Sequence, residues 1–91
     1  MSKAAPPTKA QRARWQILRD HGCIICGQSY PSIHHLFTGG GGRKNHDKVA
    51  ALCHYHHQGE QGIHTLSRKV FSERFMSEEK MQQKAERIAP L

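Results

Sequence analysis

The sequence predicts a small α+β domain. Apolar residues recur at helical spacing near both ends of the 91-residue chain, and two short apolar or β-favouring runs lie between them. Only 36% of the residues are hydrophobic, and a chain of this size buries only about 60% of the surface of its unfolded state. We therefore expect one domain over residues 8–91 with a marginal core, preceded by a disordered tail over residues 1–7.

A first helix is predicted from Lys9 to His21. Thr8 and Gln11 have the spacing of a capping box at its start, and Gly22 is a typical residue at the end of a helix. The predicted apolar face contains Ala10, Ala13 and Ile17, with Trp15 and Leu18 flanking it. A lone tryptophan on such a face is expected to pack in the core rather than to stack on a nucleobase.

Two short strands are predicted in the middle of the chain, over Ile33–Phe37 and Val49–Leu52. Four consecutive glycines interrupt the segment between them, so Thr38–Lys44 is predicted to be a loop. A short helix is expected from Cys53 to about Gln58, where glycines break it.

The last third of the chain is predicted to be helical. Leu66–Met76 carries apolar residues at helical spacing, and Ser77 is a typical N-cap for a further helix. An apolar stripe runs from Met81 to Ile88, and Pro90 ends it. We expect one or two C-terminal helices that pack on the core.

The cysteines indicate a structural metal site. All three lie in two short pairs, Cys23-x2-Cys26 and Cys53-x2-His56. Three cysteines cannot all form disulfide bonds within one chain, whereas each short pair can occupy two corners of a tetrahedron around Zn²⁺. A structural zinc ion contributes on the order of 10 kcal/mol or more in small domains, so it would compensate for a marginal core.

Further histidines predict a second site. His34 and His35 are adjacent on a predicted strand, so their side chains should point to opposite faces. One of them can then bind a metal ion while the other faces a reacting water. His57 follows the zinc ligand His56 in a predicted helix and points about 100° away from it, so it can bind a second ion. His64 can return to the same ion after a segment bounded by glycines.

The charge of the chain favours an anionic partner. The formal net charge is +7 and the pI is about 9.8, a balance that is typical of proteins that bind nucleic acid. The sequence has no apolar run of membrane-spanning length and no signal peptide, and its free thiols favour a cytoplasmic location. The candidate contacts to backbone phosphates are Arg43, Lys44, Lys48, Arg68 and Lys69.

Phosphodiester hydrolysis requires the same set of groups. A general base deprotonates water, and histidine has a suitable pKa near neutral pH. A cation neutralises charge on the phosphate and on the leaving oxygen. A third group fixes the orientation of the base. A pair of adjacent histidines within a zinc-bound, basic domain is therefore expected to be functional, and these groups would suit phosphodiester hydrolysis.

At these residues the sequence resembles the HNH, or ββα-metal, nucleases. The resemblance is closer to one branch, the phage recombination enhancement function (Ref) family of RecA-dependent nucleases. It extends over about Thr8 to Glu79. The specific features are the Cys-x2-Cys pair, the histidine pair before a glycine-rich loop, Leu52–His57 and Gly62-Ile63-His64.

The resemblance implies a zinc-bound ββα-metal core and a DNA endonuclease that acts with a RecA filament in a bacterial or phage-infected cell. It implies that His35 is the general base and that His34, His57 and His64 bind a catalytic Mg²⁺, Mn²⁺ or Zn²⁺ ion. The common HNH pattern has an asparagine where this chain has Lys48. His46 and Asn45 are therefore both candidates for the catalytic residue that orients the base.

Two other interpretations remain open at the level of the sequence. A non-catalytic, zinc-stabilised module that binds nucleic acid needs only the four zinc ligands and the basic surface. An adaptor for a recombinase filament would use the C-terminal helices as its docking face. The number of metal ions per chain separates the nuclease, with two, from the binding module, with one.

Overall fold

The computed structural model describes residues 6–38 and 44–91. Most of the predicted tail, most of the predicted glycine-rich loop and Arg43 lie outside these residues. Within them, none of the helices combines the length and the apolar character that a membrane span requires. The helices are α1 (Lys9–His21), α2 (His54–His57), α3 (Arg68–Arg74) and α4 (Glu78–Ile88), and the strands are β1 (Ser32–His35) and β2 (Val49–Leu52).

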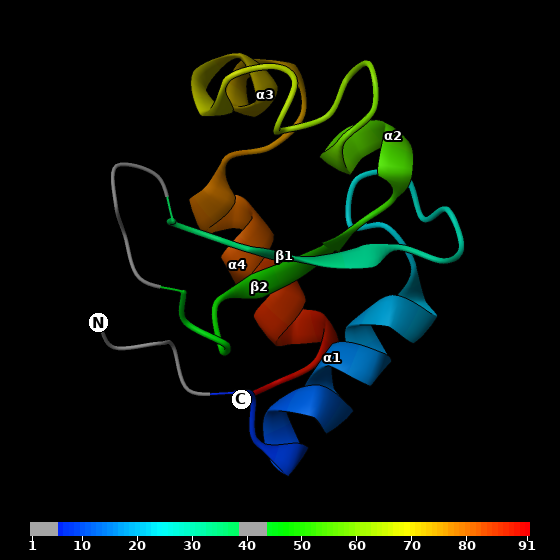
Figure 1. The fold of residues 1–91 in the computed structure, drawn as a ribbon, viewed down its shortest axis with the longest axis vertical. Coiled ribbons are helices and arrows are strands. Elements are labelled where there is room, and N and C mark those ends of the chain that lie inside the picture. The colour runs from blue at the N-terminus through cyan, green and yellow to red at the C-terminus, as the bar shows by residue number, and fades with distance from the viewer. Residues whose placement is uncertain (1–5, 39–43) are drawn as a thin grey trace.

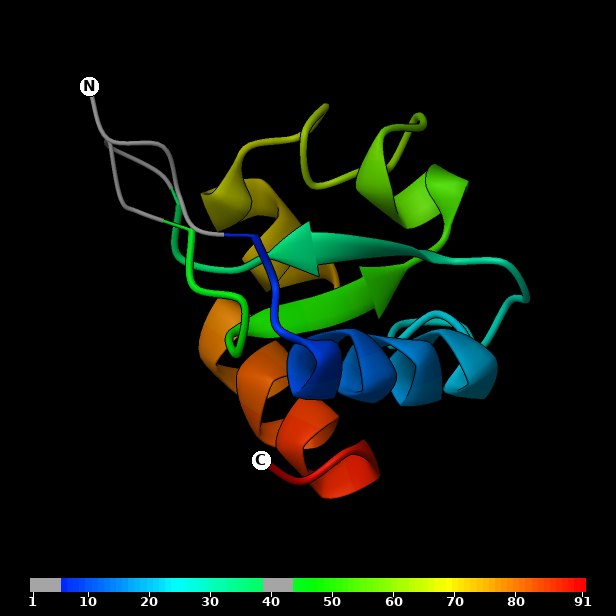
Figure 2. The same ribbon diagram turned by 60° about the horizontal axis from the view of Figure 1, so that its bottom comes forward.

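The protein is a small α+β fold around a two-stranded antiparallel sheet (Figure 1). Figure 2 shows α1 and α4 on one side of the sheet, and α2 and α3 on the other. All four residues of β2 are buried because helices cover the strand. The core joins both strands to the helices, and its largest fully buried side chains include Leu18, Leu36, Leu52, Phe71 and Met81.

Helix α1 has the predicted bounds but a different buried face. The capping box of Thr8 and Gln11 is present at its start. The predicted apolar face is wrong: Ala10 and Ala13 are exposed, and Ile17 is 51% exposed. Arg14 and Leu18 are the buried residues of the helix.

Arg14 occupies the inward position because backbone carbonyls compensate its charge there. Its Nε donates to the carbonyl of Ala89 at 2.7 Å, and one terminal nitrogen donates to the carbonyl of Asp47 at 2.9 Å. A buried cation is tolerated only when such partners replace water. Burial nevertheless lowers the pKa of Arg14 from its ordinary value.

Strand β1 begins one residue earlier and ends two residues earlier than predicted. Its register pairs Ser32 with Leu52 and His35 with Val49. The strand cannot continue through Phe37, because this residue has a φ of 60°, in the left-handed region. The backbone N–H of Phe37 instead donates to a carboxylate oxygen of Glu78 at 2.7 Å. The end of β1 is thus tied to the start of α4.

The C-terminal part contains two helices, the upper limit of the prediction. The hydroxyl groups of Ser67 and Ser77 accept hydrogen bonds from backbone N–H groups in the first turns of α3 and α4. Helix α3 covers less than the predicted Leu66–Met76, because each helix has its own cap. Arg68 of α3 forms an ion pair of 2.7 Å with Glu78 of α4 and so joins the two helices.

Candidate metal centres and active site

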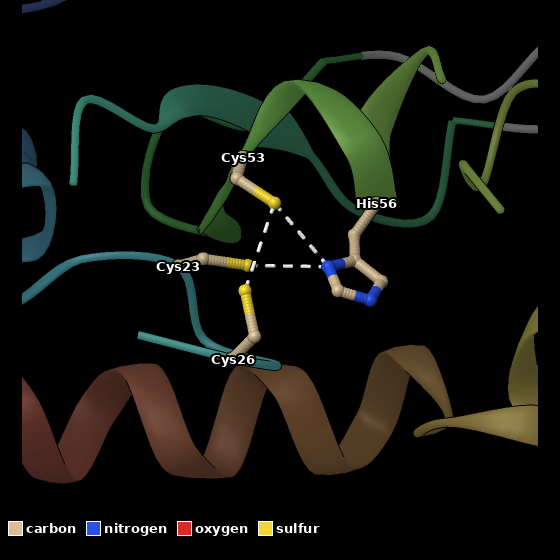
Figure 3. Close-up of side chains that lie close together, drawn as sticks. All are labelled: Cys23, Cys26, Cys53 and His56. Atoms are coloured by element: carbon tan, nitrogen blue, oxygen red, sulfur yellow. Dashed lines mark hydrogen bonds between the residues drawn. The ribbon is translucent and has the colours of Figure 1, made fainter. Parts of the chain in front are cut away.

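The first metal centre joins the turn after α1 to the start of α2. Figure 3 shows Cys23, Cys26, Cys53 and His56 pointing toward a common centre. Their ligand atoms all lie within 4.8 Å of one another. The Sγ atoms of Cys26 and Cys53 are 3.7 Å apart, and Nδ1 of His56 is 3.3 Å from Sγ of Cys53 and 3.9 Å from Sγ of Cys23.

These spacings are those of a tetrahedral zinc site. Zn–S bonds of about 2.3 Å and Zn–N bonds of about 2.0 Å, at tetrahedral angles, separate two sulfurs by about 3.8 Å and a sulfur from a nitrogen by about 3.5 Å. The four predicted ligands are therefore brought together by the fold, and they can hold a metal ion such as zinc.

Local backbone geometry places the first pair of cysteines. Gly27 has a φ of 78°, and its N–H donates to the carbonyl of Cys23 at 2.7 Å, which closes the turn. The N–H of Ile24 donates to the carbonyl of Ala51 at 2.8 Å, so the turn is attached to β2. Cys53, the N-cap of α2, follows that strand directly.

The surroundings of this centre shift the pKa values of its ligands. Burial lowers the pKa of His56, which therefore offers a neutral imidazole. Burial raises the pKa of the Cys53 thiol to about 11. A divalent ion offsets that effect because it binds the thiolate.

The second cluster consists of His34, His57 and His64. Their ligand nitrogens also lie within 4.8 Å of one another, and the Nε2 atoms of His57 and His64 are 3.0 Å apart. His34 is 4% exposed, and its buried Nε2 has no hydrogen-bond partner among the described residues. A buried polar atom of this kind requires an explanation, and a metal ion is one.

The charge states of His34 and His57 suit metal binding. Burial lowers the pKa of His34 to about 3, with smaller contributions from His57, His64 and Arg68. Burial, with His64 and His54, lowers the pKa of His57 as well. Neutral imidazoles are ligands for transition-metal ions, so the residues present fit a second divalent ion.

A pH titration tests the burial of His34. Its pKa is about 3 in the folded state against 6.5 ordinarily, so only the unfolded state is protonated between these values. The resulting stability is fully present above about pH 6.5 and is lost as the pH falls toward 3. We expect the free energy of unfolding of protein without an ion at the second cluster, measured in urea between pH 7.5 and 5, to fall more steeply for wild type than for His34→Gln.

The matched control for this titration is His21→Gln, at the exposed end of α1 and outside both clusters. It should keep the steep wild-type pH dependence. Equal slopes for wild type and His34→Gln would contradict the burial of a neutral His34.

His35 lies on the opposite face of β1 from His34 and contacts His46. Nε2 of His35 is 3.0 Å from Nδ1 of His46. Burial, followed by His46 and Lys44, lowers the pKa of His35, so it is neutral near pH 7. Asn45, the other candidate, uses its side-chain oxygen to accept the N–H of Asp47 at 2.9 Å, so its amide shapes the turn that carries His46.

A hollow of about 230 Å³ connects the second cluster to His35. It is lined by residues of β1, of α2 and of the segments after them, including Lys44. This volume accommodates a phosphate group and water beside the imidazoles. The lining residues are Ile33, His34, His35, Thr38, Lys44, His57 and His64.

Two polar contacts of these histidines were not predicted from the sequence. Ser32 Oγ is 2.9 Å from Nδ1 of His57 and 3.5 Å from the carbonyl of Leu52. Trp15 Nε1 donates to the carbonyl of His46 at 2.9 Å. The signal for Ser32 was present, because it precedes His34 by two residues and so shares its face of the strand. Trp15 had only its helical spacing, which indicated core.

The predicted phosphate contacts differ in their surroundings. Lys44, Lys48 and Lys69 are exposed. Lys48 lies 5.7 Å from the centre of the Phe37 ring. The charge of Arg68 is partly matched by Glu78. Among the described candidates, Lys44 is the one that lines the histidine hollow.

One protein-family model matches the chain. The family model described as recombination enhancement, RecA-dependent nuclease matches residues 7–89, almost the whole chain. The chain belongs to this family. The family name implies a nuclease, and therefore an enzyme, with DNA and RecA as interaction partners in recombination. A search of curated proteins found no match.

Proposed function

We propose that this RecA-dependent nuclease family member is a metal-dependent DNA endonuclease of the HNH, or ββα-metal, type. The observation that supports the proposal most is that two adjacent histidines of β1 have different surroundings. His34 points into a three-histidine cluster and His35 points to His46, yet both line one hollow. A metal site and a base beside the same space are what hydrolysis of a phosphodiester requires.

In the proposed reaction, neutral His35 takes a proton from a water molecule, and the resulting hydroxide attacks the phosphorus. Nε2 of His35 contacts Nδ1 of His46, so the other ring nitrogen of His35, Nδ1, is left to accept the proton. A divalent ion held by His34, His57 and His64 would supply positive charge to the phosphate and to the departing 3′ oxygen.

The two metal centres have different proposed roles. Three cysteines and one histidine complete a four-coordinate shell, which is typical of structural zinc. Three histidines leave a coordination position for water or phosphate, which is typical of a catalytic ion. Ser32 supports this assignment, because its contact with Nδ1 of His57 leaves Nε2 to face the cluster.

Lysines around the hollow are proposed to hold the DNA backbone. Lys44 lines the hollow, and Lys48 is four residues further along the chain, directly before β2. Contacts of this kind position the strand without reading its sequence. The proposed set also includes Arg43, Arg68 and Lys69.

The non-catalytic zinc module is the weaker alternative. It requires the Cys23–His56 centre and the positive charge, but it gives no reason for a buried histidine nitrogen without a partner at His34. The recombinase adaptor likewise leaves the His35–His46 contact unexplained.

Metal content and cleavage together test the proposed function. We expect two divalent ions per purified chain and cutting of plasmid or single-stranded DNA in Mg²⁺, Mn²⁺ or Zn²⁺, with the rate raised by a RecA filament. One ion per chain, DNA binding and no cutting under any condition would instead establish the zinc module. Binding to the filament without cutting in any metal would establish the adaptor.

A further inference from the structure

Helix α1 holds the segment that carries His46. Three of its side chains donate hydrogen bonds to consecutive residues of that segment. Gln11 Nε2 donates to the carboxylate of Asp47 at 3.1 Å, and Arg14 donates to the Asp47 carbonyl at 2.9 Å. Trp15 Nε1 donates to the carbonyl of His46 at 2.9 Å. A helix remote in sequence therefore fixes the backbone on which His46 stands.

Trp15 also contacts the rings of both histidines. Its ring centre is 5.6 Å from that of His35, with the planes at 89°, and 5.4 Å from that of His46, with the planes at 70°. These are edge-to-face arrangements. The indole thus restrains the two imidazoles whose nitrogens are 3.0 Å apart, besides restraining the backbone of one of them.

The His35–His46 contact depends on such restraint. A hydrogen bond between two neutral imidazoles needs an N–H on one nitrogen and a lone pair on the other, aligned along the line between them. A small rotation of either ring breaks the alignment and lets both rings exchange tautomers. His46 stands on a segment without regular secondary structure, so its position depends on neighbours.

We propose that Trp15 is a positioning residue for the nuclease reaction, acting through His46 to fix the tautomer and orientation of His35. This inference rests on the proposed role of His35 as general base. Trp15 itself does not touch the reacting atoms. Its indole N–H holds the His46 backbone, and its ring edge limits the rotation of both imidazoles.

The sequence allows a closely matched replacement. Trp15 is the single tryptophan of the chain, and Cys23 lies eight residues later, so residues 1–22 can be synthesised and joined to Cys23 by ligation. Replacing Trp15 with benzothienylalanine keeps the two-ring shape and exchanges the N–H for a sulfur. Trp15→Phe is the second variant, because it also removes the N–H and is encoded genetically.

The kinetic test uses a double-mutant cycle with His46→Ala. We expect benzothienylalanine at position 15 to lower kcat about tenfold, while KM and metal content stay close to wild type. The unfolding midpoint should fall only slightly, because the His46 carbonyl loses one donor. In the His46→Ala background the same replacement should leave kcat unchanged. The proposal would be overturned if kcat fell equally in both backgrounds, or if kcat fell only in proportion to the unfolding midpoint.

A second readout does not depend on cleavage. Nitrogen-15 chemical shifts of the imidazoles report tautomers directly. In wild type we expect His35 and His46 each in one fixed tautomer, and in both Trp15 variants we expect averaged shifts. Unchanged shifts would overturn the positioning role. If wild type cuts no DNA, the proposed function fails, and these shifts still decide whether Trp15 orients the pair.

Discussion

Replacing Cys53 with serine is expected to unfold the protein under conditions in which the wild type is folded. Cys53 is 2% exposed, and its sulfur contacts both Cys26 and His56. Structural zinc binding contributes on the order of 10 kcal/mol or more, against a total stability of about 5–15 kcal/mol for a domain. Circular dichroism and metal content per chain are the measurements.

The matched control for Cys53→Ser is His54→Ala. His54 is the next residue, is exposed and lies outside both clusters, so this variant should keep its fold and its metal. Removing the metal from wild type with a strong chelator should reproduce the loss of structure seen in Cys53→Ser. A folded, cooperative Cys53→Ser protein without metal would show that the core suffices and that the centre is dispensable.

Replacing His35 with alanine is expected to lower DNA cleavage by about 10²- to 10⁴-fold, the usual contribution of a general base. The expected cause is the loss of the proton acceptor, because His35 lines the hollow beside the three-histidine cluster. The measurement is the single-turnover cleavage rate of plasmid DNA with the RecA filament and divalent metal present. Metal content and the unfolding midpoint are measured on the same preparation.

Two comparisons make the His35 result specific. His21→Ala, at an exposed position of α1, should cleave like wild type. His35→Ala should keep both metal ions, because neither cluster contains His35. Cleavage by His35→Ala at the wild-type rate would assign the base to another residue, and loss of the second ion would mean that His35 supports metal binding instead.

In two pairs of neighbouring histidines, the two members of each pair belong to different sites. On α2, His56 belongs to the cysteine centre while His57 belongs to the three-histidine cluster. On β1, His34 joins the same cluster while His35 contacts His46. Because each pair is on one short element, a metal ion that orders α2 at the cysteine centre would also order a ligand of the proposed second site. Loss of the first ion is therefore expected to disrupt both centres.

Features that depend on local spacing follow from the order of residues along the chain. The capping box at Thr8 set the start of α1, and an i, i+3 spacing placed Cys53 and His56 on one side of a helical turn. Strand alternation separated His34 from His35. Such geometry is fixed within one turn or one pleat, so it does not depend on the rest of the fold.

Which polar groups meet across the chain depends instead on how the elements pack together. Arg14 is buried in place of Ile17 because it reaches carbonyls 33 and 75 residues away. The contacts of Trp15 with His46 and of Ser32 with His57 span 31 and 25 residues. Such pairings arise from packing between elements, and neither hydrophobic periodicity nor propensity within one element contains that information.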